Sequence, residues 1–317
     1  MKTGQTGKFY TATIFLFLIL SSVLVMAFKV EGEFADLYSI LYAQASLFIA
    51  LTVNVAVLAF SRKKQGLKPL YFPFLAKEKG KYDIFAYLLM LPLSFMIVFG
   101  FNDLNEVVLH LFSKIGITGS AISVFWTTPG YLVIALVLIA LTPAIIEETF
   151  IRGYCLDGLG GMKNFQAILI SALLFSVMHM NPAQTVYQFM LGIILAVIVK
   201  ISGNITYSML LHFCNNAIVL LTTYFSDDYS NPTIDAKFTL QALGYALAGV
   251  IGVFAVLSLF AYIFRRKESS ETTLRWFKGL MVKEGDDITA ATKAEKITFW
   301  LFFAVVAVVW LLNTILM

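Results

Sequence analysis

The chain of 317 residues is 59% hydrophobic and 13% charged, with a formal net charge of +4 and a mean hydropathy of +0.83. This apolar share exceeds that of soluble globular proteins and is typical of a polytopic membrane protein. Nucleic-acid binding would need a clustered basic face, and the sequence shows none. The two cysteines, Cys155 and Cys214, lack metal-ligand spacing and are interpreted as packing residues.

The predicted fold class is all-α, a membrane helix bundle of about eight core transmembrane helices and a ninth at the C-terminus. About 20 predominantly apolar residues are needed to cross a membrane core. The runs that qualify are 9–28, 39–60, 84–101, 131–156, 165–180, 186–199, 205–225, 240–264 and 297–317. The sixth run is expected to form a short helix. The first is interpreted as retained, because no convincing cleavage site follows it.

Loop charge predicts how the chain crosses the membrane. With the N-terminus inside, three of the 23 basic residues, Lys29, Lys114 and Lys237, lie in outer segments, and all the others lie in inner ones. This asymmetry follows the positive-inside rule. We therefore predict a multi-pass membrane protein with its N-terminus inside. The membrane is expected to be a bacterial cytoplasmic membrane. The outer stretch 104–115 has helical apolar spacing and is expected to lie along the interface.

Five segments are predicted. Residues 1–128 hold helices one to three and an outer loop, and residues 129–226 hold a core of helices four to seven. The eighth helix falls in 227–266 and a polar cytoplasmic linker in 267–296. The ninth helix, 297–317, is interpreted as an accessory anchor.

Two adjacent glutamates, Glu147 and Glu148, lie inside the fourth apolar run and are followed by Arg152. An ionisable side chain inside a spanning helix is costly, so a functional site is the default interpretation. Residues four apart share a helix face, and Glu148 and Arg152 are therefore expected to pair. Glu147 is rotated by about 100° from Glu148 and is expected to keep its carboxylate available.

Two histidines lie inside other apolar runs. His179 follows Phe175 by four residues in the fifth run, and His212 precedes Asn216 by four residues in the seventh. A carboxylate and an imidazole can together activate water as a general base. A second imidazole and an amide can donate hydrogen bonds to a developing oxyanion. This set suits hydrolysis of a peptide bond without a protein nucleophile.

Three motifs carry a family resemblance. They are EExxxR at residues 147–152 (EETFIR), FxxxH at 175–179 (FSVMH) and HxxxN at 212–216 (HFCNN). All three lie in apolar runs and in the order found in the CPBP family of CAAX proteases and bacteriocin-processing proteins, which includes the type II CAAX prenyl endopeptidases. The chain resembles this family over about residues 131–225.

The resemblance implies an intramembrane endopeptidase of about eight helices. If the roles of the family's motif residues apply at the matching positions, Glu147 activates water with help from His179, and His212 and Asn216 stabilise the oxyanion. Glu148, Arg152 and Phe175 would support the site. No cofactor is favoured; if the enzyme depends on a divalent metal such as zinc, the ligands would be Glu147, His179 and His212. The implied partners are the lipid bilayer and a membrane-embedded or lipid-anchored protein or peptide, with no nucleic acid.

Two other functions stay open at this point. A proton- or cation-coupled transporter could use Glu147, His179 and His212 as a relay, although no paired hydropathy repeat is visible. A non-catalytic membrane scaffold or immunity protein could keep the polar cluster for packing. For a protease, we expect a polar cavity that contains Glu147, opens toward the cytoplasm and admits reagents to Ser208, one turn before His212.

Overall fold

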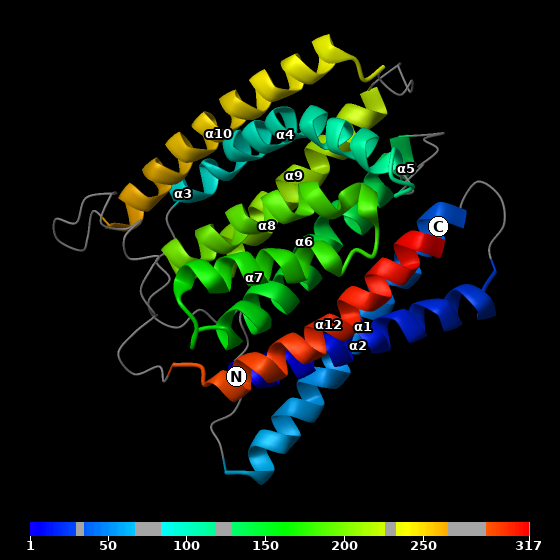
Figure 1. Ribbon diagram of the computed structural model, residues 1–317, viewed down its shortest axis with the longest axis vertical. Helices are drawn as coiled ribbons and strands as arrows, with labels where there is room; N and C mark the ends of the chain where they lie inside the picture. Colours follow the sequence, from blue (N-terminus) through cyan, green and yellow to red (C-terminus); the bar gives the residue numbers. More distant parts are fainter. Residues whose placement is uncertain (30–34, 67–83, 118–128, 226–232, 266–289, 317) are drawn as a thin grey trace.

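A computed structural model describes residues 1–29, 35–66, 84–117, 129–225, 233–265 and 290–316, and the regular structure of these residues is helical throughout (Figure 1). The elements are α1 Thr3–Ala27, α2 Ala35–Lys64, α3 Ile84–Leu88, α4 Met90–Ser113, α5 Pro129–Ala135, η1 Leu136–Leu141, α6 Thr142–Glu148, η2 Thr149–Leu156, α7 Asn164–Val177, α8 Pro182–Ser202, α9 Ile205–Phe225, α10 Ala236–Arg265 and α12 Lys293–Leu316. Within the described residues, 8 helical stretches are long and apolar enough to cross a membrane. The predicted all-α, multi-pass fold is confirmed. Most of the predicted linker, 267–296, lies outside the described residues.

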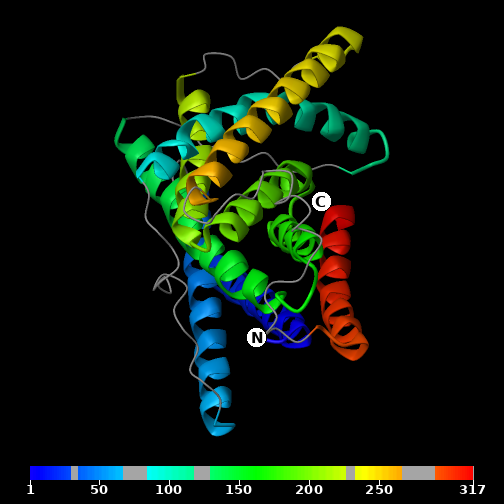
Figure 2. The same cartoon turned by 90° about the vertical axis from the view of Figure 1, so that its left-hand side faces the viewer.

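The bundle has three groups of helices, which both views show (Figures 1 and 2). On one side, α10 packs along α4, and on the other α1 packs against α2 and α12. Between them lie α6 to α9, where α7 packs on α8 and α9 contacts both α6 and α8. The motif-bearing segments therefore occupy the centre of the bundle.

The last helix, α12, runs parallel to α1. Gly7 of α1 faces Phe299, and the Thr11 hydroxyl donates to the carbonyl of Phe302 at 2.9 Å. A Cβ at Gly7 would lie 2.9 Å from the Phe299 Cα, so the glycine permits the close approach. Successive membrane crossings alternate in direction, so a first and a ninth crossing run the same way. The parallel packing of α1 and α12 therefore agrees with the predicted ninth helix.

The short helix of the bundle is the fifth, and the prediction that the sixth is short is wrong. The fifth, α7, has 14 residues, whereas α8 has 21 and begins at Pro182, four residues before the predicted start. Proline suits a first helical turn because its missing N–H needs no partner there. Asn181 caps the helix by accepting from the Ala183 N–H at 3.0 Å. Polar residues in the first turns of α8 concealed this start.

The predicted interfacial helix at 104–115 is also corrected. Helix α4 continues without a break to Ser113, so most of this stretch extends the third crossing. Val107 is buried, and the Asn105 amide donates to the carbonyl of Ala183 at 3.2 Å. Of the apolar residues in this stretch, Leu104, Val107 and Val108 are at least partly buried, whereas Leu111 is 55% exposed.

Wide π-helical turns flank the glutamates: η1 precedes α6 and η2 follows it. Pro143 at the start of α6 has no N–H to donate to the carbonyl of Ile139, four residues earlier. Both the backbone N–H and the hydroxyl of Thr142 donate to the Val137 carbonyl, the hydroxyl at 2.8 Å, so one residue supplies two donors to this acceptor. Such π-turns are frequent at functional sites.

Candidate active site

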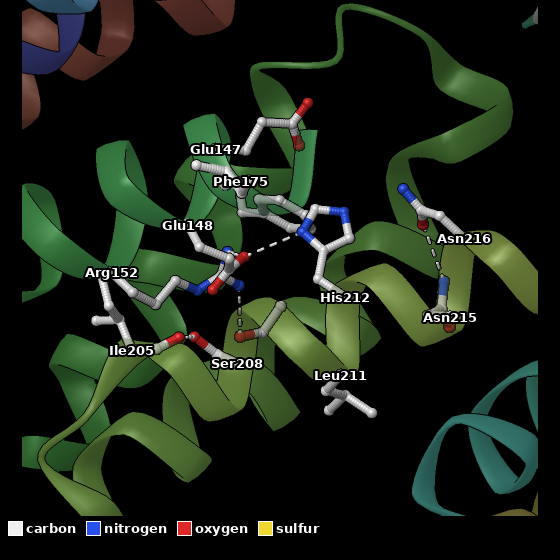
Figure 3. A network of polar contacts seen from close by, with 12 residues as sticks. Glu147, Glu148, Arg152, Phe175, Ile205, Ser208, Leu211, His212, Asn215 and Asn216 are labelled. Carbon is white, nitrogen blue, oxygen red and sulfur yellow. Dashed lines mark hydrogen bonds and ion pairs between the residues drawn. The ribbon is translucent and has the colours of Figure 1, made fainter. Parts of the chain in front are cut away.

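The centre of the site is a buried cluster around Glu148 (Figure 3). Its Oε1 accepts from Arg152 Nη1 at 2.7 Å and lies 3.2 Å from His212 Nδ1. All three side chains are at most 2% exposed. The predicted pairing of Glu148 with Arg152 is present, and a residue 64 positions away joins it.

Arg152 is held on two further sides. Its Nη2 donates to the carbonyl of Gly192 on α8 at 3.1 Å, and its guanidinium carbon lies 4.2 Å from the centre of the Phe175 ring. Phe175 also makes edge-on contacts with both His179 and His212, with ring centres 5.0 and 5.5 Å apart. The phenylalanine of the second motif thus packs against side chains of both other motifs, Arg152 and His212.

Glu147 faces away from this cluster and toward His179. Its Oε2 lies 3.7 Å from His179 Nε2 and, though buried, accepts no hydrogen bond. This distance is too long for a direct hydrogen bond, but a water molecule beside the two atoms, in the adjoining cavity, could contact both. The structure therefore divides the two glutamates as predicted: Glu148 is paired, and Glu147 is available.

A backbone carbonyl fixes the orientation of the His179 ring through the nitrogen that does not face Glu147. Its Nδ1 lies 2.8 Å from the carbonyl of Phe175, which can only accept, so Nδ1 carries the proton. In a neutral ring, the lone pair then lies on Nε2, the atom that faces Glu147. Met180, the next residue, has φ +50°, a left-handed conformation uncommon for a non-glycine residue. Its carbonyl accepts from the Asn313 amide of α12 at 2.7 Å.

Asn216 uses the carbonyl that Pro143 leaves free. Its Nδ2 donates to Ile139 O at 3.0 Å, and its Oδ1 accepts from Asn215 Nδ2 at 3.3 Å. Tyr187 on α8 donates to Asn215 Oδ1 at 2.7 Å, which extends the chain of hydrogen bonds. Asn216 therefore stands in a fixed orientation at the site, with one amide hydrogen still available.

These groups line one cavity of about 500 Å³, which includes Glu147, His179, His212 and Asn216. Carboxamide side chains dominate the rest of its polar lining. They are Gln44, Asn102, Asn105, Asn181, Gln184, Gln188 and Asn215. A smaller cavity of about 150 Å³ between α1 and α2 also reaches Glu147 and His179, so this pair lies between two spaces that water could fill.

The position of the cavity corrects the expected access. Its lining extends from Glu147 to Asn102, midway along α4, and to Thr223, near the end of α9 that lies away from the basic loops. Under the N-inside orientation, this half of the bundle faces outward, so the expectation of a cytoplasmic opening is wrong for that orientation. Ser208 is fully buried and is not part of the cavity lining.

Sequence reasoning missed several residues that complete the site. Tyr187, Gln44 and Gln188 lie on helices without a motif, and no spacing rule connects them to one. The sequence signal that could have identified them is that each is a polar residue inside or beside an apolar run. Among the described residues, no group of three or more His, Cys, Asp or Glu is arranged to hold a metal ion.

One comparison with known proteins finds a match over the part of the chain that carries these residues. Residues 129–218 match the family model described as type II CAAX prenyl endopeptidase Rce1-like. The matched segment runs from α5 into α9 and contains all three motifs. No curated protein and no solved structure matches the chain.

Proposed function

Since residues 129–218 place this chain among the CAAX-type intramembrane endopeptidases, we propose that it cleaves a peptide bond with water activated by Glu147 and His179. The observation that supports this proposal most directly is the 3.7 Å approach of Glu147 Oε2 to His179 Nε2 at the cavity wall. A water molecule in the cavity beside these two proton acceptors could hydrogen-bond to both of them. The water would give its proton to this pair and attack the carbonyl carbon.

The opposite side of the cavity would stabilise the oxyanion. Asn216 has a free amide hydrogen, and His212 offers its Nε2. His212 can donate from Nε2 while Nδ1 donates to Glu148 only in its doubly protonated form, because a neutral imidazole has one N–H. The Glu148 carboxylate lies 3.2 Å from Nδ1 and can accept its hydrogen in that form. Glu148 would thus act through His212, and Arg152 would neutralise Glu148.

The proposed substrate is a membrane-embedded or lipid-anchored protein or peptide. Fixed dipoles in a site with little water are strong stabilisers of developing charge, and the cavity supplies such dipoles inside the bundle. We propose a mechanism without a catalytic metal, in which every step uses a side chain of the three motifs. We also propose the N-inside orientation, which would give substrates access from the outer half of the membrane.

The test is a comparison of protein N-termini in membranes containing either the wild-type chain or Glu147→Gln. We expect one or a few cleavage products to disappear, because loss of general base assistance lowers the rate roughly 10²–10⁴-fold. Glu106→Gln is the matched control, since Glu106 lies on α4 outside the cavity lining. Equal product patterns for Glu147→Gln and the wild type would reject the proposal. In a further experiment, membranes with the wild-type chain are treated with a chelator. If the cleavage products then disappear and only added zinc restores them, the mechanism depends on a metal and the metal-free proposal is rejected.

A further inference from the structure

Carboxamide side chains from three helices that carry no motif surround the large cavity as a carboxamide wall, and we propose that this wall binds the main chain of an extended, uncharged segment of the substrate. This carboxamide wall consists of Gln44 from α2, Asn102 and Asn105 from α4, and Gln184 and Gln188 from α8. The inference rests on the proposed function, because it assigns the substrate class of the same site.

The wall contains oxygen atoms that lack a partner. Asn105 is 8% exposed; its Nδ2 donates to Ala183 O, but its Oδ1 accepts no hydrogen bond. Oε1 of Gln44 and Oε1 of Gln188 are likewise buried without a partner. A buried acceptor that is left unsatisfied costs free energy. Three such acceptors on three helices around one cavity indicate a ligand that brings several donors.

A peptide main chain has the required chemistry. It presents N–H and C=O groups at every residue, with a rise of about 3.3 Å per residue when extended. A carboxamide offers both a donor and an acceptor, so it can bind either group. Gln184 and Gln188 lie one turn apart and share a face of α8. Such a wall would bind the main chain of the segment, whichever uncharged side chains the segment carries.

The charge and size of the cavity limit the segment further. Of the described residues that line the cavity, Glu147 is the one acidic residue, and none is a lysine or arginine. A charged substrate side chain would lose its water there without gaining a partner. A volume of about 500 Å³ suits a short unwound segment, because an α-helix with its side chains is about 10–12 Å wide. The segment is therefore uncharged and locally extended.

The test measures binding separately from cleavage. The full-length Glu147→Gln variant in lipid nanodiscs is titrated with a fluorescent apolar peptide of about 20 residues whose central segment is uncharged. A second peptide has esters in place of three central amides, which removes the N–H donors and keeps the shape. We expect the ester peptide to bind roughly two- to tenfold more weakly for each lost hydrogen bond.

Variants assign this difference to the wall. Gln188→Leu and Gln44→Leu should each reduce the ratio between the two affinities, as a double-mutant cycle detects. The matched control is Gln241→Leu, because Gln241 is exposed on α10 and should leave the ratio unchanged. Equal binding of the two peptides, an unchanged ratio in both wall variants, or no binding of either peptide would each overturn the inference.

Cleavage of the amide peptide by the wild-type chain separates this inference from the proposed function. Cleavage together with equal binding of both peptides would reject the carboxamide wall alone. Donor-dependent binding without cleavage of any peptide or membrane protein would reject the protease and keep the wall.

Discussion

At the residue scale, the buried charge cluster predicts unequal roles for the two glutamates. Glu148→Gln leaves Arg152 charged and unpaired where it is 2% exposed, and breaking a buried pair costs about 3–5 kcal/mol. We expect a lower melting temperature in detergent, which differential scanning fluorimetry measures. The double variant Glu148→Gln with Arg152→Met should recover part of the loss. Equal melting temperatures for the wild type and both variants would show that the pair contributes nothing to stability.

At the scale of elements, the crossing of α4 and α10 depends on two glycines. A Cβ at Gly249 would lie 2.8 Å from the Gly100 Cα, whereas a Cβ at Gly244 on the same helix meets nothing within 4 Å. Gly249→Ala should therefore destabilise the protein by about 1–3 kcal/mol through overpacking. Gly244→Ala should be neutral or stabilising, because alanine is the better helix former by about 1 kcal/mol. The same sign of change in melting temperature for both variants would contradict this account of the crossing.

Helix α12, interpreted from the sequence as an accessory anchor, also contacts the turn that follows His179. Asn313 donates to the Met180 carbonyl, next to His179, and so holds a turn with an uncommon conformation. We predict that Asn313→Leu lowers kcat roughly two- to tenfold, the value of one hydrogen bond, with KM little changed. Asn313→Gln should restore part of the rate because it keeps a donor. Leu312→Ala, which changes an exposed neighbour, is the control and should leave kcat unchanged. An unchanged kcat in Asn313→Leu would show that this contact of α12 does not affect catalysis.

At the scale of the whole molecule, the two ends of the bundle differ in charge and access. Thr223 is exposed and lines the cavity, and Lys163 is exposed at the basic end. In a background without Cys155 and Cys214, we expect Thr223→Cys to react with an impermeant thiol reagent from outside and Lys163→Cys from inside. The reverse pattern would invert the orientation and place the cavity toward the cytoplasm.

Sequence alone determined the features that depend on local rules. Apolar runs of membrane length predicted the helical fold, because the hydrocarbon core requires them. The helical repeat predicted that Glu148 pairs with Arg152 and that Glu147 turns elsewhere, since these relations span one turn. The start of α8 was missed, although Asn181 and Pro182 carry a start signal, because polar residues in its first turns lowered the apolar score.

Only the tertiary structure decided which groups meet across helices. The contact of His212 with Glu148 and the bond from Asn313 to Met180 join residues far apart in the chain, and no periodicity connects them. The carboxamide wall likewise needs α2, α4 and α8 at fixed positions around one space. Helix packing in a membrane depends on close contact and polar bonds between helices, and a single sequence specifies these contacts only through the folded bundle.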